Sequence, residues 1–283
     1  MSNTSARIWK AAINFFKYAA LCLAGFMVLF PLVTILFTAL KTNDEYTTTT
    51  VMTMPQNWFY FGNFISAWQR ARLGLAFVNS ALILVFVLSL SVLFSSMLAF
   101  VLNRFKFPGN ALIRNLFLFA ALIPGVAMQV TVYQIMYSLG LINSLAGYII
   151  LMLGTDVISI YIFLQFFVNL PVSLDESAII DGCTYFGVYF KILFPLLQPA
   201  IVTCMILKGV GTYNEYYMAN LYLQDKNRLQ VVATSLYTFT GPMGSQYNYI
   251  CAGVIMTIIP ALLIFILCQK QIYAGLANGA VKG

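Results

Sequence analysis

Three polar residues near the end of an apolar run have helical spacing: Lys208, Thr212 and Glu215. On an α-helix the positions i, i+4 and i+7 lie on one face. Their neighbours add an amide and two aromatic rings, from Tyr213, Asn214 and Tyr217. This combination suits a sugar, which presents hydroxyl groups and C–H patches together. The alternative is that the tyrosines form an aromatic belt at a membrane surface.

Two charged residues, Asp156 and Lys208, lie inside runs that are otherwise apolar. A rise of about 1.5 Å per residue puts both near the middle of a bilayer. Charges there are costly and need partners. Three interpretations stay open: the two residues pair with each other, Lys208 faces the path of a cargo, or Lys208 pairs with another subunit.

A polar segment, residues 169–197, separates two apolar runs. Ser173 and Glu176 have the spacing of a capping box, and Gly182 suits the left-handed end of a first short helix. Thr184 is placed to cap a second short helix, which the following prolines would end. Aromatic residues on this helix either dock another protein or pack on the chain's own spans: Phe186, Tyr189 and Phe190.

The chain lacks the usual components of an enzyme site. It has no histidine, five cysteines without ligand spacing, and no glycine-rich phosphate loop. We therefore predict no catalytic residue, no metal site and no cofactor bound by this chain. The net charge of +7 comes from basic residues spread along the ends of apolar runs, so we expect no nucleic-acid partner.

The composition predicts the class of structure. Hydrophobic residues make up 61% and charged residues 8%, whereas about 25% is charged in a soluble domain. We predict an all-α, polytopic membrane helix bundle in a single domain, residues 1–283. Its six transmembrane helices are expected near residues 16–40, 76–102, 112–136, 147–168, 198–221 and 248–270.

The distribution of lysine and arginine predicts the orientation. Basic residues are more numerous near both termini and beside the 169–197 segment than at the opposite ends of the spans. The richer side is normally cytoplasmic. Both termini, the 169–197 loop and the tail at about 271–283 are therefore expected in the cytoplasm.

The 169–197 loop resembles the EAA motif of ABC importer permeases, which reads Glu-Ala-Ala, three residues, Gly, nine residues and Ile-x-Leu-Pro. The matching positions, with one acid between them, are Glu176, Ser177, Ala178, Asp181, Gly182, Ile192 and Pro195. Other segments are similar to the G subunit of maltose-type carbohydrate importers, namely 79–80, 104–109, 213–215 and 271–283. Gln165, Cys183 and Tyr213 depart from the residues usual in that family.

The resemblance implies a permease subunit of an ATP-driven carbohydrate importer, in the plasma (inner) membrane of a bacterium or archaeon. Such a subunit is not an enzyme and forms half of the translocation path. The implied partners are a second related permease, a cytoplasmic ATPase dimer that holds ATP and Mg, an extracytoplasmic solute-binding protein, the carbohydrate and membrane lipid. The EAA residues would enter a cleft of the ATPase. We also expect the tail to touch the ATPase through Gly279, Lys282 and Gly283.

Two other functions compete with this one. A permease of a non-sugar ABC importer would have the same loop. An ion-coupled secondary transporter would use intramembrane acids or histidines; this chain has no histidine and, by our assignment of spans, at most two such acids. Such a carrier would also have no need of the loop.

Overall fold

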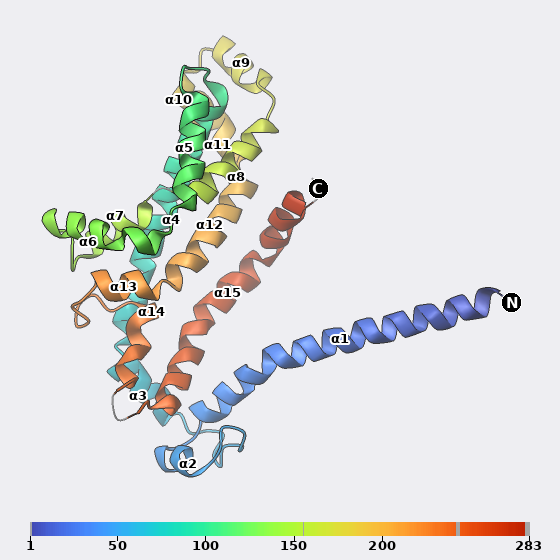
Figure 1. Ribbon diagram of the computed structural model, residues 1–283, viewed down its shortest axis with the longest axis vertical. Helices are drawn as coiled ribbons and strands as arrows, with labels where there is room; N and C mark the ends of the chain where they lie inside the picture. The colour runs from blue at the N-terminus through green and yellow to red at the C-terminus, as the bar shows by residue number, and fades with distance from the viewer. Residues whose placement is uncertain (1, 155, 242–243, 281–283) are drawn as a thin grey trace. The chain divides into compact units, whose positions relative to one another are not determined.

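The computed structural model describes residues 2–154, 156–241 and 244–280, which contain helices and connecting turns but no strand (Figure 1). The all-α prediction is therefore confirmed. The chain divides into two compact units, residues 1–71 with 236–260, and residues 72–235 with 261–283.

The first unit is organised around the end of its longest helix. Its elements are α1 (Ser2–Ala39), α2 (Asn43–Thr48), α3 (Gly62–Arg70), η3 (Leu236–Phe239) and the first part of α15 (Tyr247–Ala280). The buried Asn63 side chain donates hydrogen bonds to the carbonyls of Ala39, at 2.8 Å, and Lys41, at 2.6 Å. It also accepts one from Asn248 at 3.3 Å. These bonds satisfy the backbone carbonyls at the end of α1.

The second unit is built around α4 (Leu73–Arg104). The other elements are α5 (Asn110–Leu122), η1 (Gly125–Met128), α6 (Gln129–Ser138), α7 (Leu145–Leu153), α8 (Val157–Val168), α9 (Ser173–Ile180), α10 (Tyr185–Gly187), the π-helical η2 (Val188–Leu193), α11 (Phe194–Leu196), α12 (Gln198–Tyr213), α13 (Tyr216–Tyr222) and α14 (Val232–Ser235). Helix α4 packs against α7, α8 and α12. Its buried serines, Ser80, Ser91, Ser95 and Ser96, are small enough for neighbouring helices to approach closely.

Two apolar clusters hold the second unit together. One joins α4, α8, η2 and α12 around Phe163, Phe167, Tyr189 and Leu193. The other joins α4, α7, α13 and the segment after α13 around Val87, Tyr148, Tyr222 and Leu223. Together the two clusters fix both ends of α4 within the unit.

The spans are less regular than predicted. Among the described residues, three helices are long and apolar enough to cross a membrane, or up to six if each of three bent pairs is one span. The expected span 112–136 turns by 90° between α5 and α6, at Pro124 and Gly125. The expected span 147–168 consists of α7 and α8, which meet at 48°. Charge-free length shows how much chain can enter a membrane, but not whether the helix is continuous, so the count of six stays a prediction.

The last helix is longer than predicted. Helix α15 begins at Tyr247 and continues to Ala280, beyond the expected end at residue 270. The backbone of residues 271–280, the greater part of the expected tail, is therefore helical.

Candidate functional site

The first short helix of the loop, α9, forms where the sequence predicts it but begins differently. Val172 precedes the helix with helical backbone angles, and no side chain caps it. The carbonyls of Pro171 and Val172 already accept the first N–H groups, from Leu174, Asp175 and Glu176. Ser173 therefore lies inside the first turn, and the predicted capping box of Ser173 and Glu176 is wrong.

The end of α9 is as predicted. Gly182 has a φ of +85°, which a residue with a Cβ atom rarely adopts. The Gly182 N–H donates to the carbonyl of Ile179 at 3.0 Å, and the Cys183 N–H donates to that of Ala178 at 2.9 Å. This is the Schellman arrangement, which satisfies the last carbonyls of a helix and reverses the chain sharply.

The second helix starts and ends as predicted. The Thr184 hydroxyl accepts a hydrogen bond from the Gly187 N–H, at 3.2 Å. The helix then continues through α10, η2 and α11 and meets α12 at 75°. Its last residue is Leu196, which lies between Pro195 and Pro199, and the turn directly before Pro195 widens into a π-helix. A π-turn alters the hydrogen-bond register just where proline has no N–H to donate.

A buried ion pair fastens α9 to the bundle. Arg104, at the end of α4, and Asp175, in α9, lie with Nε and Oδ2 2.6 Å apart, and their side chains are 8% and 10% exposed. Arg104 also donates to the carbonyls of Phe167, at 3.3 Å, and Leu170, at 3.1 Å. One guanidinium thus joins α4, the end of α8 and the start of the loop. The sequence prediction included neither Asp175 nor this role of Arg104.

A second contact fastens the second helix. The Tyr189 hydroxyl and Ser96 Oγ lie 2.6 Å apart in the interior. The Tyr189 ring packs against Phe100, with centroids 5.4 Å apart. Tyr189 and Leu193 therefore pack on the chain's own spans, whereas Phe186 and Phe190 stay exposed. The packing alternative therefore holds for Tyr189, and docking of another protein by Phe186 and Phe190 stays a prediction.

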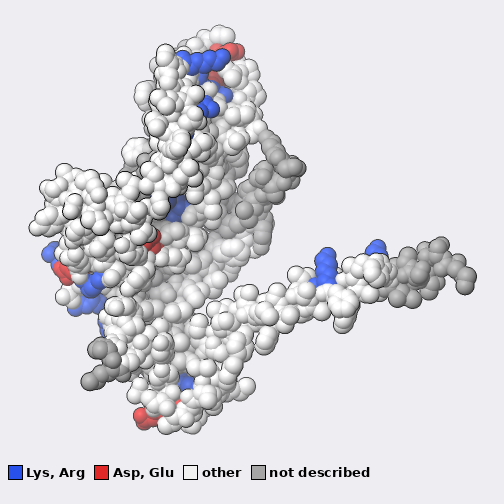
Figure 2. Space-filling view, viewed as in Figure 1, with Lys and Arg blue, Asp and Glu red and all other residues white. Residues whose placement is uncertain are grey.

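The structure divides the residues of the EAA motif into an exposed and an inward group. Ala178 is buried and Ile192 packs against the core. The exposed members are Glu176, Ser177, Asp181, Gly182 and Pro195, and beside them Ile180 is 85% exposed. In Figure 2 both signs of charge gather at the end of the second unit that carries α9 and α10. We call the exposed residues of α9 and of the turn that ends it, Glu176, Ser177, Asp181 and Gly182, the coupling surface.

The other candidate residues lie around the end of α12. This helix ends at Tyr213, and Asn214 and Glu215 form a break before α13. The Glu215 side chain caps α13 by accepting from the Met218 N–H, at 3.0 Å. The prediction that Glu215 shares a helix face with Lys208 and Thr212 is therefore wrong, because the helix stops before Glu215.

The two intramembrane charges lie close together. Lys208 Nζ is 4.0 Å from Asp156 Oδ2, and their side chains are 24% and 11% exposed. Asp156 is otherwise well satisfied, because it accepts from Ser91 Oγ at 3.1 Å, Ser159 Oγ at 2.8 Å and Ser159 N at 3.2 Å. The geometry supports the pairing interpretation, although 4.0 Å is long for a contact between the Lys208 ammonium and a carboxylate oxygen.

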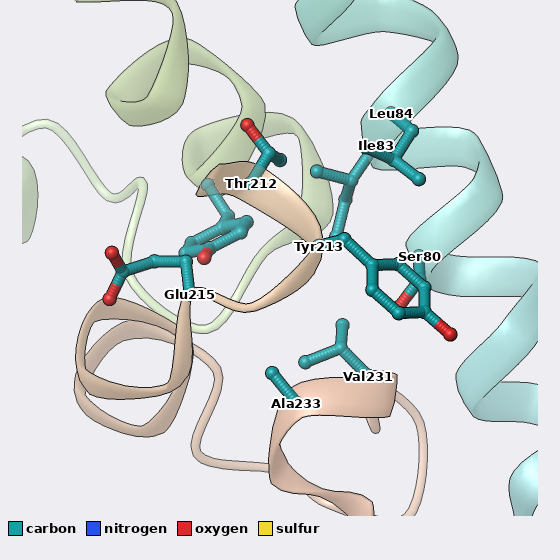
Figure 3. A pocket seen from close by; sticks show the side chains of 9 residues that line it. Ser80, Ile83, Leu84, Thr212, Tyr213, Glu215, Val231 and Ala233 are labelled. Atoms are coloured by element: carbon teal, nitrogen blue, oxygen red, sulfur yellow. The ribbon is translucent and has the colours of Figure 1, made fainter. Parts of the chain in front are cut away.

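A small pocket lies beside the break after α12 (Figure 3). Thr212, Tyr213 and Glu215 line it together with residues of α4, α7 and the α13–α14 segment, namely Ser80, Ile83, Leu84, Tyr148, Val231 and Ala233. In this view the Tyr213 ring lies beside Ser80, and the Glu215 carboxylate points the opposite way. The interior volume of about 10 Å³ is room for roughly one water molecule. Asn214 and Tyr217 are exposed and do not line the pocket.

The tail residues can be placed only in part. Gly279 lies in the backbone of α15. Lys282 and Gly283 lie outside the described residues, so the expected contact with an ATPase stays a prediction.

Comparison with known proteins agrees with this architecture. Residues 91–270 match the family described as binding-protein-dependent transport system inner membrane component. The arabinooligosaccharides transport system permease protein AraQ of Halalkalibacterium halodurans is 31% identical to this chain, over 92% of this chain and 93% of AraQ. The melibiose/raffinose/stachyose import permease protein MelC of Bacillus subtilis is 30% identical, over 89% of this chain and 91% of MelC.

Two further matches widen the comparison. The sulfoquinovosyl glycerol transport system permease protein SmoH of Agrobacterium fabrum is 30% identical, over 90% of this chain and 89% of SmoH. A chain in the crystal structure of a bacterial ABC transporter, involved in the import of the acidic polysaccharide alginate, superposes with a TM-score of 0.81. It is 19% identical, and the match covers 95% of this chain and 98% of that one, so it shows the common fold.

These matches define a class, the membrane-embedded components of transport systems. Within this class the chain belongs to the family of binding-protein-dependent transport system inner membrane components. The family resemblance found in the sequence is confirmed.

Proposed function

We propose that this chain is the permease subunit of an ATP-driven carbohydrate importer. The observation that carries the proposal is the coupling surface: Glu176 and Asp181 face outward, while Asp175 fastens the same helix to the bundle. A rigid, exposed element of this kind suits contact with another protein. The carbohydrate cargo is supported by relatives named for arabinooligosaccharides and for melibiose, raffinose and stachyose.

The coupling surface docks into a cytoplasmic ATPase dimer, which holds ATP and Mg. When the two ATPases close, they move α9 and the helix that follows it. Arg104 joins α9 to α4 and α8, and Tyr189 joins η2 to α4. A movement of α9 and η2 is therefore transmitted to the spans. The result is alternating access by rigid-body motion.

The cargo path lies between this chain and a second, related permease. The pocket beside the break after α12 is too small for a sugar, and a second permease would supply the opposite wall of a wider path. The candidate path residues of this chain are Lys208, Thr212, Tyr213, Asn214, Glu215 and Tyr217. A solute-binding protein delivers the cargo from the outer side, both termini lie in the cytoplasm, and the tail contacts the ATPase.

Co-expression with the neighbouring transporter genes tests this function. The chain should co-purify with an ATPase and a second permease, and the loaded solute-binding protein should stimulate ATP hydrolysis in proteoliposomes. Uptake of a panel of oligosaccharides, monosaccharides and non-sugar solutes then identifies the cargo. Uptake by the chain without an ATPase, driven by an ion gradient, would contradict the proposal.

A further inference from the structure

A large hollow lies beside the turn between α4 and α5. Ten residues between Leu102 and Arg114 line it, and its volume is about 670 Å³. The hollow is an open concavity of the surface, lined by this one turn, rather than an enclosed cavity. Its volume far exceeds the 10 Å³ of the pocket beside α12.

The walls of the hollow are held in place by the turn itself. Gly109 has a φ of +91° and precedes α5. The Asn110 side-chain amide donates to the carbonyls of Leu102, at 2.9 Å, and Phe105, at 3.0 Å. The Arg114 guanidinium also donates to the carbonyl of Leu102. A ligand would therefore meet a preformed site, which lowers the entropic cost of binding.

The hollow is positively charged. Lys106 and Arg114 are among the described residues that line it, and none of those residues is acidic. The two ion pairs of the described residues join other side chains, so neither Lys106 nor Arg114 has a carboxylate partner among those residues. The N-terminus of α5, which adds partial positive charge, has no side-chain cap. The hollow thus offers donors and positive charge to an anion.

An apolar face continues from the rim of the hollow. Leu112, Leu116 and Phe119 are exposed on α5, and their spacing of i, i+4 and i+7 places them on one side. At the other end of the turn, the rings of Phe105 and Tyr185 lie 5.0 Å apart, so the hollow lies at the end of α4 that carries the coupling surface. We take the end of this span to lie at the level of the lipid headgroups on the cytoplasmic side, a step that rests on the proposed function.

We propose that this hollow binds the headgroup of an anionic phospholipid. The phosphate accepts hydrogen bonds from Lys106, Arg114 and the first turn of α5, and an acyl chain lies along Leu112, Leu116 and Phe119. Basic pockets at the cytoplasmic ends of spans are suited to anionic headgroups. The apolar face favours a lipid over a soluble anion, because inorganic phosphate would leave that face uncovered.

Lipid retention tests the proposal. The full chain, co-expressed with its transporter partners, is equilibrated in nanodiscs of phosphatidylcholine and phosphatidylglycerol and re-purified, and bound lipid is quantified by mass spectrometry. We expect phosphatidylglycerol to be enriched over phosphatidylcholine. Lys106→Gln should lower the enrichment about fivefold, the change that corresponds to about 1 kcal/mol per basic residue at an anionic surface. Lys106→Arg should preserve it, and Lys17→Gln on α1 serves as the matched control.

Each other outcome would overturn the proposal. Equal enrichment in the wild type, Lys106→Gln and Lys17→Gln would show that the lipid binds elsewhere. Complete displacement of phosphatidylglycerol by inorganic phosphate would make the hollow a site for a soluble anion. If Lys106→Gln abolished co-purification of the ATPase and left the amount of bound lipid unchanged, the hollow would be part of the contact with the ATPase.

Discussion

The chain interrupts its helices at two functional candidates, and the two interruptions are built differently. The turn after α9 is closed by local bonds, but the helices on both sides of it are fastened by long-range contacts, the Arg104–Asp175 pair and the Tyr189–Ser96 bond. The break after α12 is closed mainly by local bonds, such as the Glu215 cap of α13. The difference indicates that the molecule is stiff where a partner protein is expected to push. Its polar groups are more loosely held where cargo is expected to pass.

The largest effect is expected from breaking the stiff region. Arg104→Met leaves the buried Asp175 carboxylate without its counter-charge, which should cost about 3–5 kcal/mol. A lower melting temperature of the purified transporter measures this loss. Lys191→Met, which removes an exposed charge from η2, should have little effect.

A second substitution separates the charge from the packing. Arg104→Met combined with Asp175→Leu removes the whole pair and should recover part of the stability, because buried ion pairs can often be replaced by apolar residues. If Arg104→Met melts like the wild type, the pair does not fasten α9 and the contrast between the two regions fails.

The next effect concerns the turn at Gly182. Gly182→Val should cost about 1–2 kcal/mol of left-handed strain, although a Cβ there would meet nothing within 4 Å. We expect the transporter to assemble while stimulated ATP hydrolysis no longer drives uptake. Gly182→Asn should retain more uptake, since asparagine tolerates this conformation. Gly187→Ala, in ordinary helical geometry, is the control, and normal uptake by Gly182→Val would refute the coupling role.

The smallest effect on stability is expected in the loosely held region. Lys208→Met removes a partner 4.0 Å from Asp156, which keeps its bonds to Ser91 and Ser159. The loss should be smaller than for Arg104→Met, because Asp156 keeps these two partners. If Lys208 serves the cargo, uptake falls while the melting temperature stays near that of the wild type.

A double-mutant cycle with Asp156→Asn measures the coupling of this pair directly. A coupling energy well above zero supports a structural pair. Additive melting effects together with normal uptake in Lys208→Met would contradict both roles and leave a second permease as the partner of Lys208.

Local chemistry explains which parts of the loop were predictable. The roles of Gly182 and Thr184 depend on a few neighbouring residues, and both have the predicted geometry. Ser173 misled the prediction because Val172 already has helical angles, which no local pattern indicates. Pro195 and Pro199 bound the end of the second helix as predicted, since its last residue is Leu196.

Long-range contacts explain what the sequence did not indicate. Arg104 and Asp175 lie far apart in the chain, and neither has a local signature of pairing. The spacing alone shows that Asp175 and Ala178, three residues apart, share a helix face. The structure buries both side chains. An acid on the inward face of a short helix requires a basic partner. The break before Glu215 had no comparable signal, because the run from Gln198 to Tyr213 continues without a clear helix stop.

The position of Arg104 in the chain also determines when its contacts can form during synthesis. Its carbonyl partner Leu170 follows 66 residues later, and Asp175 follows after that. At about 5–20 residues per second, roughly 3–13 s separate the synthesis of Arg104 from that of Leu170. During this interval α4 is already present but α9 does not exist, so the coupling surface is completed only after α8 has emerged. A chain that stalls before Asp175 therefore lacks the counter-charge of Arg104, and α9 cannot be fastened to α4.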